Sequence, residues 1–163
     1  MAQKAATKLG TREVAVDGRY HSMLEWYCNL VVVQRRQFLL LTQATTLFSF
    51  WMPAAGLKAV EFGTMFRDAA RDALQDYGID ENDIAKVLDD GPDMFGKAAD
   101  RGVVGSMVDY ARMVQFVADD RGGLQFLDRR EMNDIANECP MSKIGMELPV
   151  EYLREILRSA GAA

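Results

Sequence analysis

Apolar residues dominate residues 28–52, where they form three short runs rich in β-branched and aromatic side chains. The runs are CNLVVVQ (28–34), QFLLLTQ (37–43) and TTLFSFW (45–51). This composition suits a pleated, half-buried surface. The separators Arg35–Arg36 and Gln43–Ala44 are of hairpin length, although neither contains the Asn-Gly signal of a type I′ turn. The pattern predicts an antiparallel meander of three strands, with a fourth around residues 13–16 at one edge.

After Pro53 the apolar positions recur every three or four residues, which is typical of helices. Gly78 is predicted to end the first helix, and Asp80 is predicted to cap the second. Asp128 with Glu131 three positions later is a capping-box signature, and Pro149 suits a first helical turn. We therefore expect helices over about 57–77, 80–88 and 103–119, after Asp128, and from Pro149 onward.

The switch from strand-like runs to helical spacing predicts an α+β fold. We expect a small antiparallel β-meander of about three to four strands, packed against a mainly helical C-terminal part. A length of 163 residues favours a single globular domain over residues 1–163. Within the helix over 103–119, one apolar face should be buried against the sheet. Its members are Val104, Met107, Ala111 and Val114.

Composition and charge narrow the classes of function. The chain is 49% hydrophobic and 26% charged, as in ordinary globular proteins, and its net charge is −5. An acidic surface opposes contacts with phosphate, so we expect no nucleic-acid partner.

The runs LVVV and FLLL are too short to cross a bilayer, and no signal peptide is apparent at the N-terminus. Cys28 and Cys139 belong to no C-x-x-C motif and are interpreted as small buried thiols. We expect a soluble, cytoplasmic protein.

The residues needed for several common chemistries are missing from the sequence. His21 is the only histidine, so a two-histidine zinc site is excluded. The glycine-rich loops that bind nucleoside triphosphates and dinucleotides are absent, as is the G-x-S-x-G motif of hydrolases. Asp89, Asp90 and Asp93 lack the spacing of a calcium loop and are interpreted as a solvated helix end. We expect no metal and no cofactor.

RGVVGSM, residues 101–107, is the stretch with the best potential for a binding site. Backbone amides at a helix start, next to an arginine, can bind an anion. In this interpretation the ligand-binding residues are Trp26, Asn29, Arg36, Arg101, Gly105, Ser106 and Asp109. In the competing interpretation, the glycines at positions 102 and 105 allow close packing, Ser106 caps the helix, and Arg101 pairs with Asp109 or another acid. The structural interpretation is favoured.

Two segments are similar to a known family. WYCNLVVVQRRQFLLLTQATTLFSF (26–50) fits W-x-x-N-L, an arginine-rich turn, an apolar strand and then T-L-x-S, and DRGVVGSMVD (100–109) resembles R-x-[VI]-[VLM]-G-[ST]-[ML]-N-[DE]. Together with the opening ATKLG, they resemble an uncharacterised bacterial family of unknown function over residues 4–115. Val108 stands where that family usually has a polar Asn. The resemblance implies an α+β fold and no particular activity.

Two functions follow as hypotheses. The first is a non-enzymatic protein-binding or regulatory domain, favoured because the catalytic motifs are missing and methionine and aromatic residues are plentiful. Its partner would be another protein, and self-association into a homo-oligomer is left open. The alternative is a nucleotide- or phosphate-binding protein, or an enzyme, that uses the helix start from Arg101 to Asp109.

Overall fold

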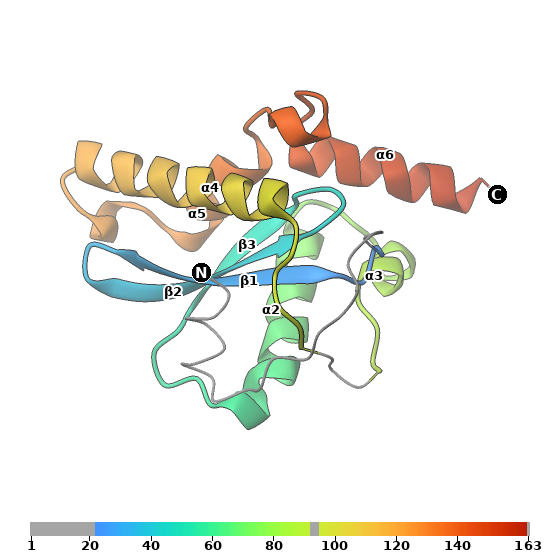
Figure 1. Cartoon of the computed structure of the whole chain (residues 1–163), viewed down its shortest axis with the longest axis horizontal. Helices are drawn as coiled ribbons and strands as arrows, with labels where there is room; N and C mark the ends of the chain where they lie inside the picture. The colour runs from blue at the N-terminus through green and yellow to red at the C-terminus, as the bar shows by residue number, and fades with distance from the viewer. Residues whose placement is uncertain (1–21, 92–94, 163) are drawn as a thin grey trace.

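A three-stranded antiparallel sheet lies at the centre of the molecule (Figure 1). The computed structural model describes residues 22–91 and 95–162. The strands are β1 (Trp26–Val33), β2 (Arg36–Gln43) and β3 (Ser49–Pro53), in the order β1-β2-β3. The predicted α+β meander is confirmed. The further strand expected around residues 13–16 lies outside the described residues.

Helices follow the sheet in the chain, as predicted. They are η1 (Ala59–Glu61), α2 (Phe62–Asp76), α3 (Glu81–Val87), α4 (Arg101–Asp120), η2 (Leu124–Phe126), α5 (Arg129–Asn137), η3 (Ser142–Ile144) and α6 (Pro149–Gly161). The Asp80 side chain caps α3 by accepting a hydrogen bond from the Asp83 amide. Asp128 and Glu131 form the predicted capping box of α5. Gly78 has a φ of +73° where the chain leaves α2, a conformation that glycine adopts without steric cost.

Helices cover both faces of the sheet. Leu39 and Leu41 of β2 lie in a core shared with α2, α3 and α6, whereas Phe38 and Leu40 lie in a second core shared with α4 and α5. Because side chains alternate across a strand, a sheet covered on both faces needs apolar residues at successive positions. This explains the uninterrupted FLLL run of β2.

The third strand begins later than predicted. The sequence suggested a strand over residues 45–51, but β3 starts at Ser49. Leu47 has a φ of +63°, which no strand residue adopts. The connection is instead a loop closed by Gln43, whose Oε1 accepts hydrogen bonds from the amide (2.7 Å) and the hydroxyl (2.8 Å) of Thr46.

The turn between β1 and β2 is displaced by one residue from its predicted place. Its central residues are Gln34 (φ +44°) and Arg35 (φ +68°), and Arg36 already pairs with Val33 in the ladder. Two positive φ values are those of a type I′ turn, which usually contains Asn and Gly. Contacts of Gln34 with α4 and η2 stabilise this conformation. Its Nε2 donates to Asp119 Oδ1 (2.9 Å), and its Oε1 accepts from the Leu124 amide (2.7 Å).

Helix α4 lies across the sheet, as Figure 1 shows. Met107 and Val114 are buried in the core between α4 and the sheet, as predicted. Val104 and Ala111 are only half-buried, at the border of that face. Asp109, Arg112 and Phe116 are exposed on the opposite side. The helix is therefore amphipathic, and its buried face is rotated from the predicted one, since it also includes Val103, Ser106, Tyr110 and Ala118.

Candidate functional site

Trp26 lies on the α2 side of the sheet. Its ring contacts Phe48, Phe50 and Phe66 in edge-to-face geometry, with centroid distances of 5.6–6.5 Å. Its indole Nε1 donates to the Val87 carbonyl (2.9 Å). The ring is therefore packed and its polar atom is hydrogen-bonded within the fold. These contacts explain a tryptophan at this position without any ligand.

Asn29 and Arg36 lie apart from Trp26. Asn29 is 2% exposed and, by the alternation along β1, faces the α4 side of the sheet. Arg36 lies at the other end of the β1–β2 hairpin from Trp26, because it pairs with Val33 while Trp26 pairs with Gln43. Its guanidinium lies 5.8 Å from the centre of the Phe38 ring. These three residues do not converge on one site.

The carboxylate of Asp100 occupies the start of α4. Its Oδ1 accepts hydrogen bonds from the amides of Gly102 (2.7 Å) and Val103 (3.1 Å), and its Oδ2 lies 2.9 Å from Lys143 Nζ. A Cβ at Gly102 would lie 3.0 Å from Lys143 Cδ, so glycine there allows the lysine to approach. The amides that the sequence offered to an anion are thus bonded to the chain's own carboxylate.

The remaining residues of RGVVGSM do not take the roles that the structural interpretation gave them. Arg101 is exposed and makes no ion pair within the described ranges, so the predicted pair with Asp109 is wrong. Asp109 instead lies 3.8 Å from Arg112. Ser106 does not cap the helix, since Asp100 does, and its hydroxyl donates to the Gly102 carbonyl (2.9 Å). Gly105 is exposed, and a side chain there would meet no atom within 4 Å.

The described part of the chain contains no candidate metal site and no candidate membrane-spanning helix. No group of three or more histidine, cysteine or acidic side chains there is placed to hold a metal ion. His21 and Asp93 lie outside the described residues. No helix among the described residues has the length and apolar character needed to cross a membrane.

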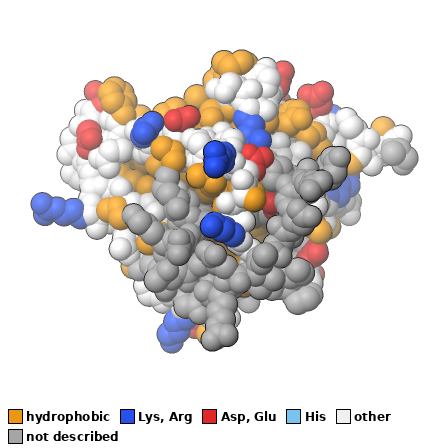
Figure 2. Space-filling model, in the orientation of Figure 1, with side chains coloured by type: hydrophobic (Ala, Val, Ile, Leu, Met, Phe, Trp, Pro, Cys, Tyr) orange, Lys and Arg blue, Asp and Glu red, His pale blue; other side chains and the backbone are white. Residues whose placement is uncertain are grey.

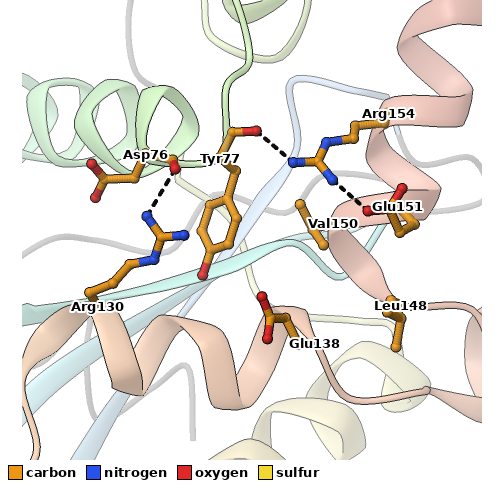
Figure 3. Close-up of a pocket in the computed structure, with 8 residues that line it drawn as sticks. All are labelled: Asp76, Tyr77, Arg130, Glu138, Leu148, Val150, Glu151 and Arg154. Carbon is orange, nitrogen blue, oxygen red and sulfur yellow. Dashed lines mark hydrogen bonds and ion pairs between the residues drawn. The ribbon is translucent and has the colours of Figure 1, made fainter.

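A hollow of about 560 Å³ lies where the end of α2 meets α5 and α6 (Figure 3). We call it the Tyr77 pocket. It is lined by Asp76, Tyr77, Arg130, Glu138, Leu148, Val150, Glu151 and Arg154. These residues come from three segments far apart in the sequence, so no local motif could have indicated the pocket. The sequence showed only Arg130 with Asp134 and Glu151 with Arg154, which resemble ordinary surface pairs at helical spacing.

Arg130 closes one side of the Tyr77 pocket. Its guanidinium carbon lies 4.3 Å from the centre of the Tyr77 ring, in cation–π geometry. Its Nη1 donates to the Asp76 carbonyl (2.9 Å), and its Nε donates to Asp134 Oδ1 (2.9 Å). The residue therefore joins α5 to the C-terminal end of α2, where a cation is favoured by the helix dipole.

Arg154 closes the other side of the pocket. Its Nη2 donates to the Tyr77 carbonyl (2.7 Å), and its Nη1 forms an ion pair with Glu151. Arg130 and Arg154 thus bind successive carbonyls at the end of α2, one from α5 and one from α6. Figure 3 shows the two guanidinium groups on either side of Tyr77. Both arginines are held in place by protein atoms before any ligand arrives.

Tyr77 is neutral near physiological pH. Burial raises the pKa of its phenol above the ordinary value of 10, and the nearby Asp134 carboxylate raises it further. The hydroxyl donates to Asp134 Oδ1 (2.5 Å), so it is engaged in a hydrogen bond. Because the Tyr77 phenol is protonated and already hydrogen-bonded to Asp134, the pocket is better suited to hold a polar ligand than to perform covalent chemistry.

A second feature lies at the far end of the sheet, where the β1–β2 turn meets the end of α4. The Gln34 amide donates to Gln115 Oε1 (3.4 Å), and the Leu124 amide donates to Gln34 Oε1 (2.7 Å). Three exposed apolar side chains lie within two residues of this network. Phe116 (72% exposed) and Phe126 (59%) lie on the α4 side of the sheet, whereas Val32 (57%) lies on the α2 side, because side chains alternate along β1. With Arg35 at the tip of the turn, we call Phe116 and Phe126 the hairpin-end surface.

Comparison with known proteins gives a family and no activity. A family model described as Domain of unknown function (DUF6933) matches residues 1–152. No curated protein and no solved structure matches the chain. The resemblance to a family of unknown function is thereby confirmed. Since the match spans most of its length, the chain belongs to the DUF6933 family.

Proposed function

We propose that the chain is a non-enzymatic protein-binding domain that contacts its partner through the hairpin-end surface. Most exposed apolar residues elsewhere in the described chain occur singly, as is normal for a globular protein. Here two phenylalanines, one from α4 and one from η2, are exposed next to one hydrogen-bonded network. This concentration is the observation that carries the proposal, because aromatic residues are enriched where proteins bind one another.

The charge at the hairpin end indicates what kind of partner fits. Arg35 and Arg36 are exposed and form no ion pair within the described residues. In Figure 2 a basic side chain projects from the left end of the molecule, where Figure 1 draws the hairpin, and apolar side chains are exposed nearby. The chain as a whole carries a net charge of −5. A partner segment with apolar and acidic side chains would complement the exposed phenylalanines and the two arginines at the tip of the hairpin.

The hairpin-end surface is held rigid before binding. The turn at Gln34 and Arg35 has two non-glycine residues at positive φ, and it is fixed by side-chain and backbone hydrogen bonds to Gln115, Asp119 and Leu124. A preorganised surface loses less conformational entropy when it binds. This rigidity supports recognition rather than a passive surface loop.

A photo-crosslinking amino acid at position 116 tests the proposal in cells that express the chain. Glu155 is a suitable control position, since it is exposed on α6, away from the hairpin end. We expect a defined protein adduct from position 116 that Arg35→Glu weakens, and no such adduct from position 155. Equal adducts from both positions, or none from position 116, would refute the proposal. An adduct of two copies of this chain would make it a homo-oligomer contact instead.

We propose that this binding serves a regulatory role in the bacterial cytoplasm. Cys28 and Cys139 are both free thiols, as in proteins of reducing compartments. Lysis of the cells in urea with a thiol-blocking reagent, followed by purification of the endogenous protein, tests this part, because unfolding exposes both thiols. Both cysteines should be recovered blocked, and a disulfide at either one would contradict a reducing location.

Phosphate or nucleotide binding at Arg101–Asp109 is the second candidate from the sequence, and it has less support. The Asp100 carboxylate accepts from the first amides of α4 and would repel an anion there. A thermal-shift series with nucleotides and inorganic phosphate at about 1 mM tests this candidate. Stabilisation that Arg101→Ala abolishes would favour it over protein binding.

A further inference from the structure

We propose that the Tyr77 pocket binds a small zwitterion, an apolar α-amino acid or a short apolar peptide with free ammonium and carboxylate groups. The pocket brings together cationic donors, a carboxylate without an ion pair in the described structure, and an apolar wall. Each of these matches one part of such a ligand. The proposal does not depend on the hairpin-end surface, to which α2 and α6 contribute nothing.

One of the two arginines would bind the ligand's carboxylate, since Tyr77 lies between their guanidinium groups. A guanidinium has five N–H donors. Arg130 uses two of its nitrogens for Asp76 and Asp134, and Arg154 uses two for Glu151 and Tyr77. Each therefore keeps N–H groups free for a further acceptor. Because both side chains are already fixed in place, they would lose little entropy on binding a carboxylate.

Glu138 would bind the ligand's ammonium group. It is exposed at the end of α5 and makes no ion pair within the described residues. Figure 3 shows its carboxylate directed into the pocket, toward the space between Tyr77 and Val150.

Glu151, another acid of the lining, is already paired with Arg154. Asp76, the third acid of the lining, makes no ion pair within the described residues either, but Figure 3 shows its carboxylate directed away from Tyr77. Glu138 is therefore the acid placed to meet a cation in the pocket.

The charge balance of the lining opposes polyanions. Asp76, Glu138 and Glu151 together outnumber Arg130 and Arg154 by one charge. A nucleoside triphosphate would meet these carboxylates along with the arginines, whereas a zwitterion satisfies both signs. The pairing of signs therefore favours a ligand that carries one positive and one negative group.

Leu148 and Val150 form the apolar part of the wall, with Val150 nearer to the Tyr77 ring. An apolar side chain of the ligand would bury its surface there. A volume of about 560 Å³ is within the range of small-molecule sites. That volume leaves room for a dipeptide as well as for a single amino acid, so both sources of the same chemistry need a test.

NMR titration of the full chain with leucine, leucyl-leucine, N-acetyl-leucine, leucinamide and inorganic phosphate tests the proposal. We expect leucine or leucyl-leucine to shift the resonances of Tyr77, Arg130 and Arg154, and the tighter of the two identifies the source. Each blocked analogue should bind on the order of tenfold more weakly, because it lacks one charge-assisted contact. No shift with either zwitterion at about 10 mM, or equal binding of the blocked analogues or of phosphate, would overturn the proposal.

Glu138→Gln provides the matched test of the site. This side chain is exposed, so its replacement should leave the fold intact, as an unchanged melting temperature would verify. We expect about tenfold weaker binding of the zwitterion and little change for N-acetyl-leucine, which has no ammonium group. Glu155→Gln, an exposed acid of α6 outside the pocket lining, should bind like the unaltered chain. Equal affinity in Glu138→Gln and Glu155→Gln would also overturn the assignment.

Discussion

Asn137 pairs with Ser49 as a strand residue would. Its Oδ1 accepts from the Ser49 amide (2.7 Å), and its Nδ2 donates to the Ser49 carbonyl (2.8 Å). One helical turn earlier, Asn133 Oδ1 accepts from the Trp51 amide (2.9 Å). β3 is an edge strand of the sheet, and an edge leaves backbone groups unpaired. The two asparagines of α5 satisfy those groups and fix the helix along the edge.

Asn137→Ala is expected to lower the free energy of unfolding by about 2–4 kcal/mol. The substitution leaves a buried amide and a buried carbonyl of Ser49 without partners, at roughly 1–3 kcal/mol each. Asn133→Ala removes one backbone contact instead of two and should cost less. Urea unfolding followed by circular dichroism measures both. Equal losses in the two variants would show that the double contact of Asn137 has no special weight.

Val114→Asp is expected to destabilise the fold strongly. Val114 is fully buried between α4 and the sheet, so the carboxylate would be desolvated without a partner. We expect a loss of about 3 kcal/mol or more. Phe116→Asp, two residues later on the exposed side of the same helix, is the control and should change stability by less than about 1 kcal/mol. Thermal unfolding compares the two, and similar melting temperatures would contradict the burial of this face.

Asp100→Ala and Arg101→Ala, at the start of α4, should differ in their effect on stability. Asp100 caps two amides and pairs with Lys143, so its loss should cost about 1–2 kcal/mol. Arg101 is exposed and has no ion pair within the described chain, so its loss should leave the melting temperature nearly unchanged. This reverses the sequence-based expectation that Arg101 stabilises a buried acid. Differential scanning calorimetry tests the difference, and a larger loss for Arg101→Ala would contradict the capping role of Asp100.

The fold could be predicted largely because its signals are local. The capping box of Asp128 and Glu131, the cap at Asp80 and the break at Gly78 each depend on a few neighbouring residues. The displaced elements depend on distant contacts instead. Gln34 takes a positive φ in a turn held by α4 and η2, and the connection before β3 is shaped by the side chain of Gln43.

The candidate site was less accessible to sequence reasoning. RGVVGSM has the composition of an anion-binding helix start, but the residue just before it, Asp100, takes the amides. Trp26 and Asn29 are close in sequence yet face opposite sides of the sheet, because side chains alternate along a strand. The Tyr77 pocket forms only when three helices meet. Its arginines look like ordinary surface residues until the end of α2 is placed between them.

Cys28 is expected to be almost inert toward alkylation in the folded protein. Burial raises the pKa of its thiol to about 12, so at pH 8 only about one thiol in ten thousand is ionised, and the thiolate is the reactive form. Reaction of Cys139→Ser, in which Cys28 is the only cysteine, with iodoacetamide should therefore be slow at pH 8 and fast in urea. A raised pKa also means that this thiol ionises at a lower pH in the unfolded chain than in the folded protein. The contribution of Cys28 to stability is then present below its ordinary pKa near 9 and is lost as pH rises toward 12. Alkylation of the native variant at the rate of a free thiol would contradict the raised pKa of this partly buried thiol.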